Sequence, residues 1–286
     1  MPKLSGDRAG RPTVSTARSI GGSAPVSVSF DSNAWEKIFD PGDRDCAPIR
    51  AALADGQLKG FICESGFRIE AIRKRERENY FAQPHSAWRD HGIVTRDGKQ
   101  YFHTSIGPAD ELHPGLPPEQ IPKLQAALAT GFKLMRGLAW MGLPAPPEIR
   151  DPLLFVAETT EARREREQRQ LDVAFLIESR GIGRAAFDAA GGWANNLGDP
   201  PDRNRLRKAC AEWADGELVS AHTAYQHDVL CTNDFARAAG ASIFDAANRA
   251  WVTAEFGVVL LTLDELATKV AAGAPCSARL RRDPDV

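Results

Sequence analysis

Strand-like and helix-like patterns of apolar and polar residues alternate through the first third of the chain. Residues 26–30 read VSVSF, in which every second residue is apolar, as in a strand with one buried face. The DSNAWEKIF that follows begins with residues that favour helix starts and places Trp35, Ile38 and Phe39 on one helical face. The same reasoning predicts a helix at 48–56, a strand at 59–63 and a helix at 65–80. Such strand-helix alternation predicts an α/β fold.

The middle of the chain departs from this alternation. Residues 92–107 carry Arg-Asp-Gly-Lys between two alternating runs, which predicts a β-hairpin. A helix is expected at 117–142, followed by a Pro-rich linker at 143–152 and a long charged helix at 157–181. These segments predict an insertion over residues 81–202.

Strand and helix patterns return near the end of the chain. They predict helices at 203–215 and 217–226, a strand at 229–231, a helix at about 242–255, a strand at 256–262 and a helix at 263–272. We therefore expect a core formed by residues 26–80 and 203–273. Residues 1–25 offer little to bury and predict a disordered tail, and residues 274–286 form a second tail.

Composition narrows the classes of function. The net charge of −2 provides no global field that would attract nucleic acid, so a polyanion would need a local basic patch. The five cysteines show no CxxC pair and no finger-like His spacing, which predicts buried thiols in a reducing compartment. No apolar stretch is long enough for a membrane span, and no secretory signal begins the chain. A cytoplasmic protein with no membrane partner is expected.

Acidic residues lie where the predicted elements meet. Asp31 follows the first strand and Asp234 follows the strand at 229–231. In an open parallel sheet the carboxyl ends of the strands share one edge, where ligands bind. Glu70 lies in the helix after the second strand, and Asp215 lies before the helix that leads to Asp234. These four carboxyl groups are therefore candidates for one site, although a single strand-end Asp is more often a helix cap.

Three stretches resemble a known family. VSVSFDSNAW is similar to the opening of PIN-domain nucleases, and DGELVSAHTAYQHDVLCTND is similar to their closing signature. The final GVVLLTLDELA also resembles the end of that family. The resemblance covers about 26–80 and 203–272, and 81–202 has no counterpart. It implies a three-layer α/β/α PIN-like domain with a central parallel sheet, which here would carry an inserted hairpin and helices.

The resemblance also implies an acidic metal site. Asp31, Asp215 and Asp234 match acids of the family motifs, and Glu70 is favoured over Glu64 as the middle acid. Phosphodiester hydrolysis near neutral pH requires an activated water and neutralised phosphate oxygens. Mg²⁺ or Mn²⁺ held by carboxylates supplies both, and these cations are the expected cofactors.

Substrate contacts are expected around the acids. Asn33 and Thr232 either orient a phosphate oxygen or cap helices, whereas capping is favoured for Ser32 and Asn233. The basic runs RKRER at 73–77 and RNRLRK at 203–208 would hold a phosphate backbone, with Arg73, Arg75 and Arg205 as the candidates. Packing is favoured over base stacking for Trp88, Tyr101 and Phe102. Substrate contact is disfavoured for both His222, which is expected to pack or face solvent, and His227, which is expected to end a helix.

The leading hypothesis is a metal-dependent nuclease acting on RNA, an endoribonuclease, with an antitoxin-like protein as a further candidate partner. A catalytically inactive PIN-like module that binds RNA or regulates a partner is the alternative. A phosphohydrolase with a nucleophilic Asp is disfavoured because Asp31 lacks a second acid two residues later. Nucleotide-binding folds receive no support, since neither GxxxxGK[ST] nor GxGxxG follows a strand.

Overall fold

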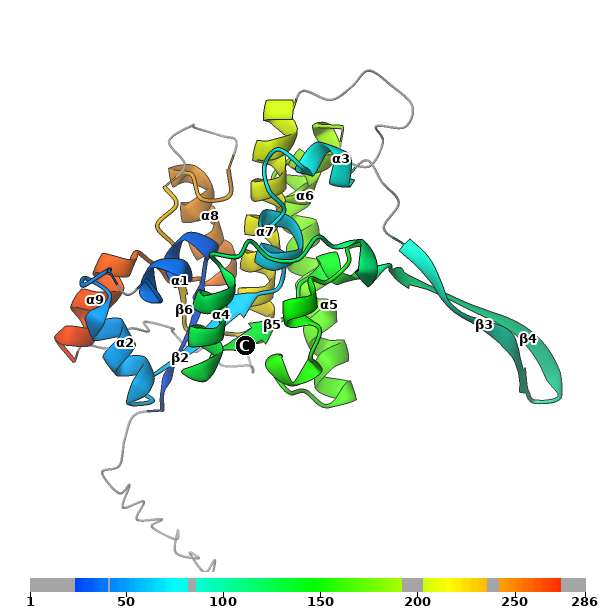
Figure 1. The fold of residues 1–286 in the computed structure, drawn as a ribbon, viewed down its shortest axis with the longest axis horizontal. Coiled ribbons are helices and arrows are strands. Elements are labelled where there is room, and N and C mark those ends of the chain that lie inside the picture. The colour runs from blue at the N-terminus through cyan, green and yellow to red at the C-terminus, as the bar shows by residue number, and fades with distance from the viewer. Residues whose placement is uncertain (1–23, 41, 82–85, 192–202, 236–241, 274–286) are drawn as a thin grey trace, which may run out of the picture.

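Five short parallel strands form the central sheet (Figure 1). Their order is β5-β2-β1-β6-β7, and each neighbouring pair is parallel. The strands are β1 (Val26–Phe30), β2 (Leu58–Cys63), β5 (Lys133–Met135), β6 (Val229–Cys231) and β7 (Leu260–Leu261). Because all five run in one direction, their carboxyl ends share one edge of the sheet. The prediction of an α/β fold with a central parallel sheet is confirmed.

A computed structural model of the chain describes residues 24–40, 42–81, 86–191, 203–235 and 242–273. The tails predicted over 1–25 and 274–286 lie outside these ranges, apart from residues 24 and 25. Within the described ranges, no helix combines the length and the apolar character that crossing a membrane requires.

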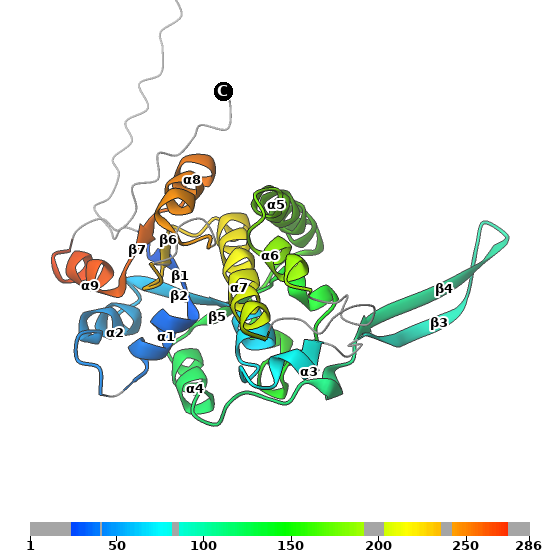
Figure 2. The ribbon, with the colours of Figure 1, turned by 90° about the horizontal axis from the view of Figure 1, so that it is seen from above.

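Helices cover both faces of the sheet (Figure 2). One layer contains α1 (Ser32–Ile38), α2 (Ala47–Ala54), α4 (Ile121–Ala129) and α9 (Leu263–Ala271); the other contains α5 (Thr160–Ser179), α7 (Arg203–Tyr225) and α8 (Ala246–Phe256). Side chains of successive strand residues point to opposite faces. Accordingly, Val28 and Phe30 of β1 join the core of the first layer, whereas Leu230 of β6 joins that of the second. The arrangement is a three-layer α/β/α fold.

A third apolar cluster lies beyond the carboxyl ends of the strands. It joins η1 (Gly66–Glu70), α3 (Arg77–Phe81) and α6 (Arg184–Ala189) to the first half of α7. The ring centroids of Phe187 and Trp213 are 4.7 Å apart, and those of Phe81 and Phe187 are 5.3 Å apart. This cluster fixes α7 above the edge at which the strands end.

The helix predicted over 117–142 is wrong beyond Ala129. The chain turns at Gly131, whose φ of 91° favours glycine, and then enters β5, which pairs with β2. A short helical turn, η3 (Leu138–Met141), follows. The expected insertion at 81–202 therefore contributes an edge strand to the sheet instead of only packing beside it. The predicted linker at 143–152 is also packed, since Leu143 and Ile149 are buried.

The single helix predicted over 65–80 is wrong as well. The chain instead forms η1, a turn over residues 71–76, and α3. Arg77 explains the break, because its buried guanidinium donates to the backbone carbonyls of Ile72 at 2.9 Å and Glu70 at 2.7 Å. Those carbonyls would otherwise belong to a continuing helix.

Residues 203–225 form one helix, α7, rather than the two predicted around Gly216. Gly216 lies against Gly183, and a Cβ added to Gly216 would approach the Gly183 Cα to 2.9 Å. The glycine therefore allows close packing and does not end the helix. Asp215 consequently lies inside a helix, not before one.

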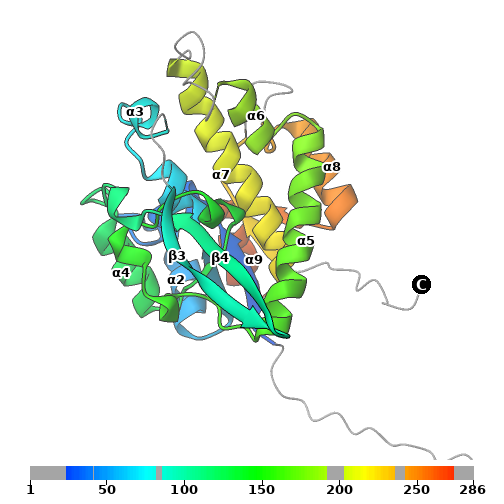
Figure 3. The same ribbon diagram turned by 90° about the vertical axis from the view of Figure 1, so that its right-hand side faces the viewer.

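The predicted hairpin is confirmed, with strands β3 (Ser86–Arg96) and β4 (Lys99–Pro108). Asp97 and Gly98 at its tip have φ values of 52° and 72°, as two-residue hairpin turns require. The hairpin projects from the body of the protein (Figures 1 and 2) and faces the viewer in Figure 3. Tyr101 and Phe102 are 51% and 72% exposed, so the prediction that they pack is wrong.

Replacing residues 92–107 with a short Gly-Ser turn should alter substrate choice more than stability. Ile93, Val94, Tyr101 and Phe102 in this segment are exposed, so its removal should leave the melting temperature within a few degrees of the parent. Thermal unfolding followed by circular dichroism measures this difference. A large loss of stability would mean that the hairpin belongs to the core.

Candidate functional site

Asp31 ends β1 and begins α1 at the carboxyl edge of the sheet. Its side chain is 4% exposed and accepts hydrogen bonds from the Ser32 amide at 2.6 Å, Asn33 Nδ2 at 2.6 Å and Thr232 Oγ1 at 2.7 Å. Burial raises the pKa of Asp31 to about 6, against the lowering effect of these bonds, and the nearby Asp234 charge raises it further. Asp31 is thus a helix cap and a strongly perturbed carboxyl group at once.

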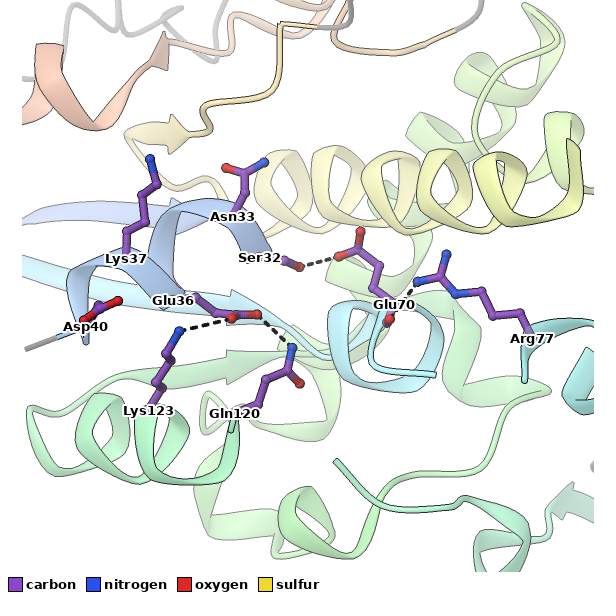
Figure 4. A pocket seen from close by; sticks show the side chains of 9 residues that line it. All are labelled: Ser32, Asn33, Glu36, Lys37, Asp40, Glu70, Arg77, Gln120 and Lys123. Carbon is purple, nitrogen blue, oxygen red and sulfur yellow. Dashed lines mark hydrogen bonds and ion pairs between the residues drawn. The ribbon is translucent and has the colours of Figure 1, made fainter. Parts of the chain in front are cut away.

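Glu70, the favoured middle acid, reaches toward Asp31. It accepts a hydrogen bond from the Ser32 hydroxyl (Figure 4). The prediction that Ser32 caps a helix is wrong, because Asp31 is the N-cap of α1. Burial, followed by the charge of Asp31, raises the pKa of Glu70 to about 7. Glu64 instead pairs with Arg68 at 2.9 Å and Arg136 at 3.4 Å. Glu70, not Glu64, therefore lies beside Asp31.

Asp215 comes to the same edge from α7, in the layer behind the sheet. Its side chain is 7% exposed and has no hydrogen-bond donor or ion-pair partner within the described residues. Burial raises the pKa of Asp215 well above its ordinary value, and the charges of Asp31, Glu70, Glu212 and Asp234 raise it further. These effects place Asp215 within electrostatic reach of the other three predicted acids.

Asp234 follows β6 and is partly exposed. Its backbone amide donates to Thr232 Oγ1 at 2.9 Å, so Thr232 links Asp234 to Asp31. Asn33 accepts from the Asn233 amide at 3.0 Å, while the Asn233 side chain accepts from the amide of Leu263 in α9. Asn33, Thr232 and Asn233 therefore fasten the ends of β1 and β6 together.

The four acids offer oxygen donors of the type that hard divalent cations prefer. Within the described residues, no three His, Cys, Asp or Glu side chains are already arranged to hold one metal ion. Two of the acids, Asp31 and Glu70, are occupied by protein hydrogen bonds, and Asp215 is not. The buried Asp215 carboxyl fits a cation because burying an uncompensated negative charge is costly.

The predicted basic contacts divide into buried and exposed groups. Arg73 and Arg75 lie on the exposed turn before α3, whereas Arg77 is only 4% exposed and is bonded to backbone carbonyls. Arg205 is exposed in the first turns of α7, against which α3 packs. The two basic runs thus lie on neighbouring elements.

The two predicted histidines lie in the core rather than at the acidic edge. His222 and His227 are buried, and the Nδ1 atom of each lies about 3 Å from the Ser29 hydroxyl on β1, at 3.0 and 2.9 Å. The His227 ring also stacks on Phe61, with centroids 3.9 Å apart. Four cysteines are buried free thiols as predicted: Cys46, Cys63, Cys210 and Cys231. Cys276 lies outside the described residues.

Sequence reasoning missed Glu212. This residue accepts hydrogen bonds from the amides of Gly183 at 3.3 Å and Ile243 at 2.8 Å, and burial raises its pKa to about 7. The signal was available, because Glu212 lies three residues before Asp215 and shares its side of a helix. The candidate acids were those near the junctions of predicted elements, and Glu212 lies within the helix predicted at 203–215.

Without divalent metal, the free energy of unfolding should fall as the pH rises from about 4 to about 7. The pKa values of Asp31 and Glu70 are raised from 3.8 and 4.5 to about 6 and 7, so the unfolded chain loses these protons first. Asp215→Asn should remove part of this dependence, raising the free energy of unfolding at pH 8 by roughly 1–2 kcal/mol but not at pH 4.5. Urea unfolding at both pH values measures it.

The exposed Asp55→Asn variant is the matched control, because Asp55 lies at the end of α2 in the other layer. It should keep the pH dependence of the parent. Glu212 and Glu217, whose burial raises their pKa values to about 7, titrate in the same range, so the difference between parent and variant is the relevant quantity. If Asp215→Asn keeps the pH dependence of the parent, the expectation that the pKa of Asp215 is raised in the folded protein is wrong.

Comparisons of the chain with protein-family models, with curated proteins and with solved structures found no match.

Proposed function

We propose that this protein is a divalent-metal-dependent nuclease with a PIN-like fold, acting as an endoribonuclease. The observation that carries the proposal is the Asp215 carboxyl, which is 7% exposed, has no donor among the described residues and is affected by three other acids predicted for the same site. Burying an ionised carboxylate without a compensating partner is costly, so burial favours the protonated form of Asp215 and a cation beside it would favour the ionised form. A divalent cation is the partner that fits this chemistry.

The geometry gives each acid a different setting. Asp31 is held in one orientation by three hydrogen bonds, and Glu70 is held by Ser32. Asp234 is partly exposed, at the side from which substrate would enter. When bound, Mg²⁺ or Mn²⁺ neutralises charge on phosphate oxygens and promotes ionisation of water. The chain's own part is to orient the carboxyl groups and to keep Asp215 away from bulk water.

Support for a nucleic-acid substrate comes from cations near this edge. Arg73 and Arg75 are exposed, and α3 beside them packs against α7, which carries Arg205. Lys and Arg contacts to phosphates contribute sequence-independent affinity that weakens with salt. The net charge of −2 makes such a local patch necessary for binding a polyanion.

Asp234→Asn should abolish metal-dependent cleavage of single-stranded RNA while leaving the fold intact. Asn keeps the shape of the side chain but not its charge, and residues that only orient metal ligands are already worth about 10–100-fold. We expect a fall of more than about 100-fold, measured on a labelled oligoribonucleotide with Mg²⁺ or Mn²⁺ and with EDTA. RNA binding should survive.

A melting curve separates the metal effect from folding. Mg²⁺ or Mn²⁺ should raise the melting temperature of the parent more than that of Asp234→Asn, because a ligand of the native state stabilises it in proportion to its affinity. The exposed Asp264→Asn on α9 is the control and should cleave like the parent. A parent that binds RNA, ignores metal and cleaves nothing would instead identify a non-catalytic RNA-binding module.

A further inference from the structure

A pocket of about 400 Å³ opens beside the acidic edge, between α1 and α4 (Figure 4). Asn33 and Lys37 point to one side, while Gln120 and Lys123 converge on Glu36 at the other. The lining residues are Ser32, Asn33, Glu36, Lys37, Asp40, Glu70, Arg77, Gln120 and Lys123. Ser32 and Glu70 therefore belong both to this pocket and to the candidate active site.

All nine lining residues are polar, which restricts the occupant. Pockets for drug-like or apolar ligands are lined predominantly by apolar and aromatic side chains, so such ligands do not suit this one. Ser, Asn, Gln, Lys and Arg side chains are those that contact the phosphates and sugars of nucleic acids. The volume lies within the usual range for binding a small polar unit such as one nucleotide.

The two lysines of the pocket have donors available for a ligand. Lys37 is exposed and has no ion-pair partner within the described ranges. Lys123 Nζ lies 3.5 Å from Glu36 Oε2, which leaves further N–H groups of the ammonium for an anion. Both lysines can therefore approach a phosphate that enters between α1 and α4.

Glu36 lies between two donors and can still accept another hydrogen bond. Its Oε1 accepts from Gln120 Nε2 at 2.7 Å and its Oε2 faces Lys123, and each carboxylate oxygen has two lone pairs. A carboxylate repels phosphate but accepts from a hydroxyl group. The ribose 2′-hydroxyl is the donor that distinguishes RNA from DNA.

We propose that this pocket binds the ribonucleotide next to the scissile phosphate, with Lys37 and Lys123 on its phosphate and Glu36 accepting from its 2′-hydroxyl. The inference rests on the proposed function and adds to it a residue that selects RNA over DNA. Ser32 and Glu70 join this pocket to the acidic cluster, so a strand bound in it leads directly to the site of cleavage.

Affinity for two oligonucleotides that differ only in the sugar hydroxyl tests this proposal. Fluorescein-labelled hexauridylate and hexadeoxyuridylate are titrated with the Asp234→Asn protein in the presence of Mg²⁺, and gels confirm that both probes stay intact. Lys37→Gln combined with Lys123→Gln should weaken the binding of both probes by more than about tenfold and reduce the salt dependence. Lys59→Gln, an exposed lysine in the first half of β2 and so toward the opposite edge, should change neither.

Glu36→Leu separates recognition of the sugar from recognition of the phosphate. Loosening Lys123 would affect both probes alike, so the ratio of the two affinities isolates the contact with the 2′-hydroxyl. The protein with Glu36 should prefer hexauridylate by about tenfold or more, and Glu36→Leu should bring the ratio close to one. An unchanged ratio would overturn the role of Glu36, and lysine variants that bind like Lys59→Gln would overturn the pocket.

Failure of this inference is distinguishable from failure of the proposed function. If the parent cleaves RNA with metal but the lysine variants keep full affinity, the pocket proposal is wrong and the nuclease stands. If the lysine and Glu36 effects appear but the parent never cleaves, the pocket stands as an RNA site and the nuclease proposal is wrong. Circular dichroism melting of each variant confirms that the fold is retained.

Discussion

Repulsion between buried carboxyl groups is the constraint on which the acidic edge depends. Parallel strands end on the same side of a sheet, so the residues that follow β1 and β6 meet there by topology. Asp215 is added from the helix layer behind. The three described apolar clusters hold these elements in place. The free energy gained by burying their side chains offsets the repulsion that would otherwise drive the carboxyl groups apart.

The acidic residues at this edge differ in the hydrogen bonds that they receive. Asp31 receives three hydrogen bonds and connects through Thr232 and Asn33 to the end of β6, so its orientation is fixed by one backbone amide and two side chains. Asp215 receives no hydrogen bond from the described residues, and burial raises its pKa well above the ordinary value. The proposed cation would therefore meet oriented oxygen atoms of Asp31 and a buried Asp215 carboxyl whose ionised form it would stabilise. The adjacent polar pocket extends the same edge outward to α4.

Local patterns predicted the strands at 26–30 and 229–231, the hairpin and the closing helix well, because each depends on short-range alternation or on a turn that needs glycine. They failed where tertiary contacts decide. Gly216 suggested a break between helices, but its contact with Gly183 lies far away in sequence. The three-residue strand β5 is too short to show alternation, and its pairing with β2 defines it. Among the acids, position at strand ends was informative for Asp31 and Asp234, whereas the bond from Thr232 to Asp31 joins segments about 200 residues apart and depends on the pairing of β1 with β6.

The buried Ser29 hydroxyl of β1 helps to set the position of α7 relative to the central sheet. A hydroxyl has one proton to donate, so it can satisfy only one acceptor nitrogen, and the ring nitrogen of His222 or of His227 must itself carry a proton. His222 lies two helical turns after Asp215 on the same side of α7, and Ser29 lies two residues before Asp31 on the same face of β1. The hydrogen bond between Ser29 and His222 therefore resists sliding of α7 along the sheet, because such a movement would break it. This buried contact thus helps to set the separation between the Asp215 and Asp31 carboxyl groups.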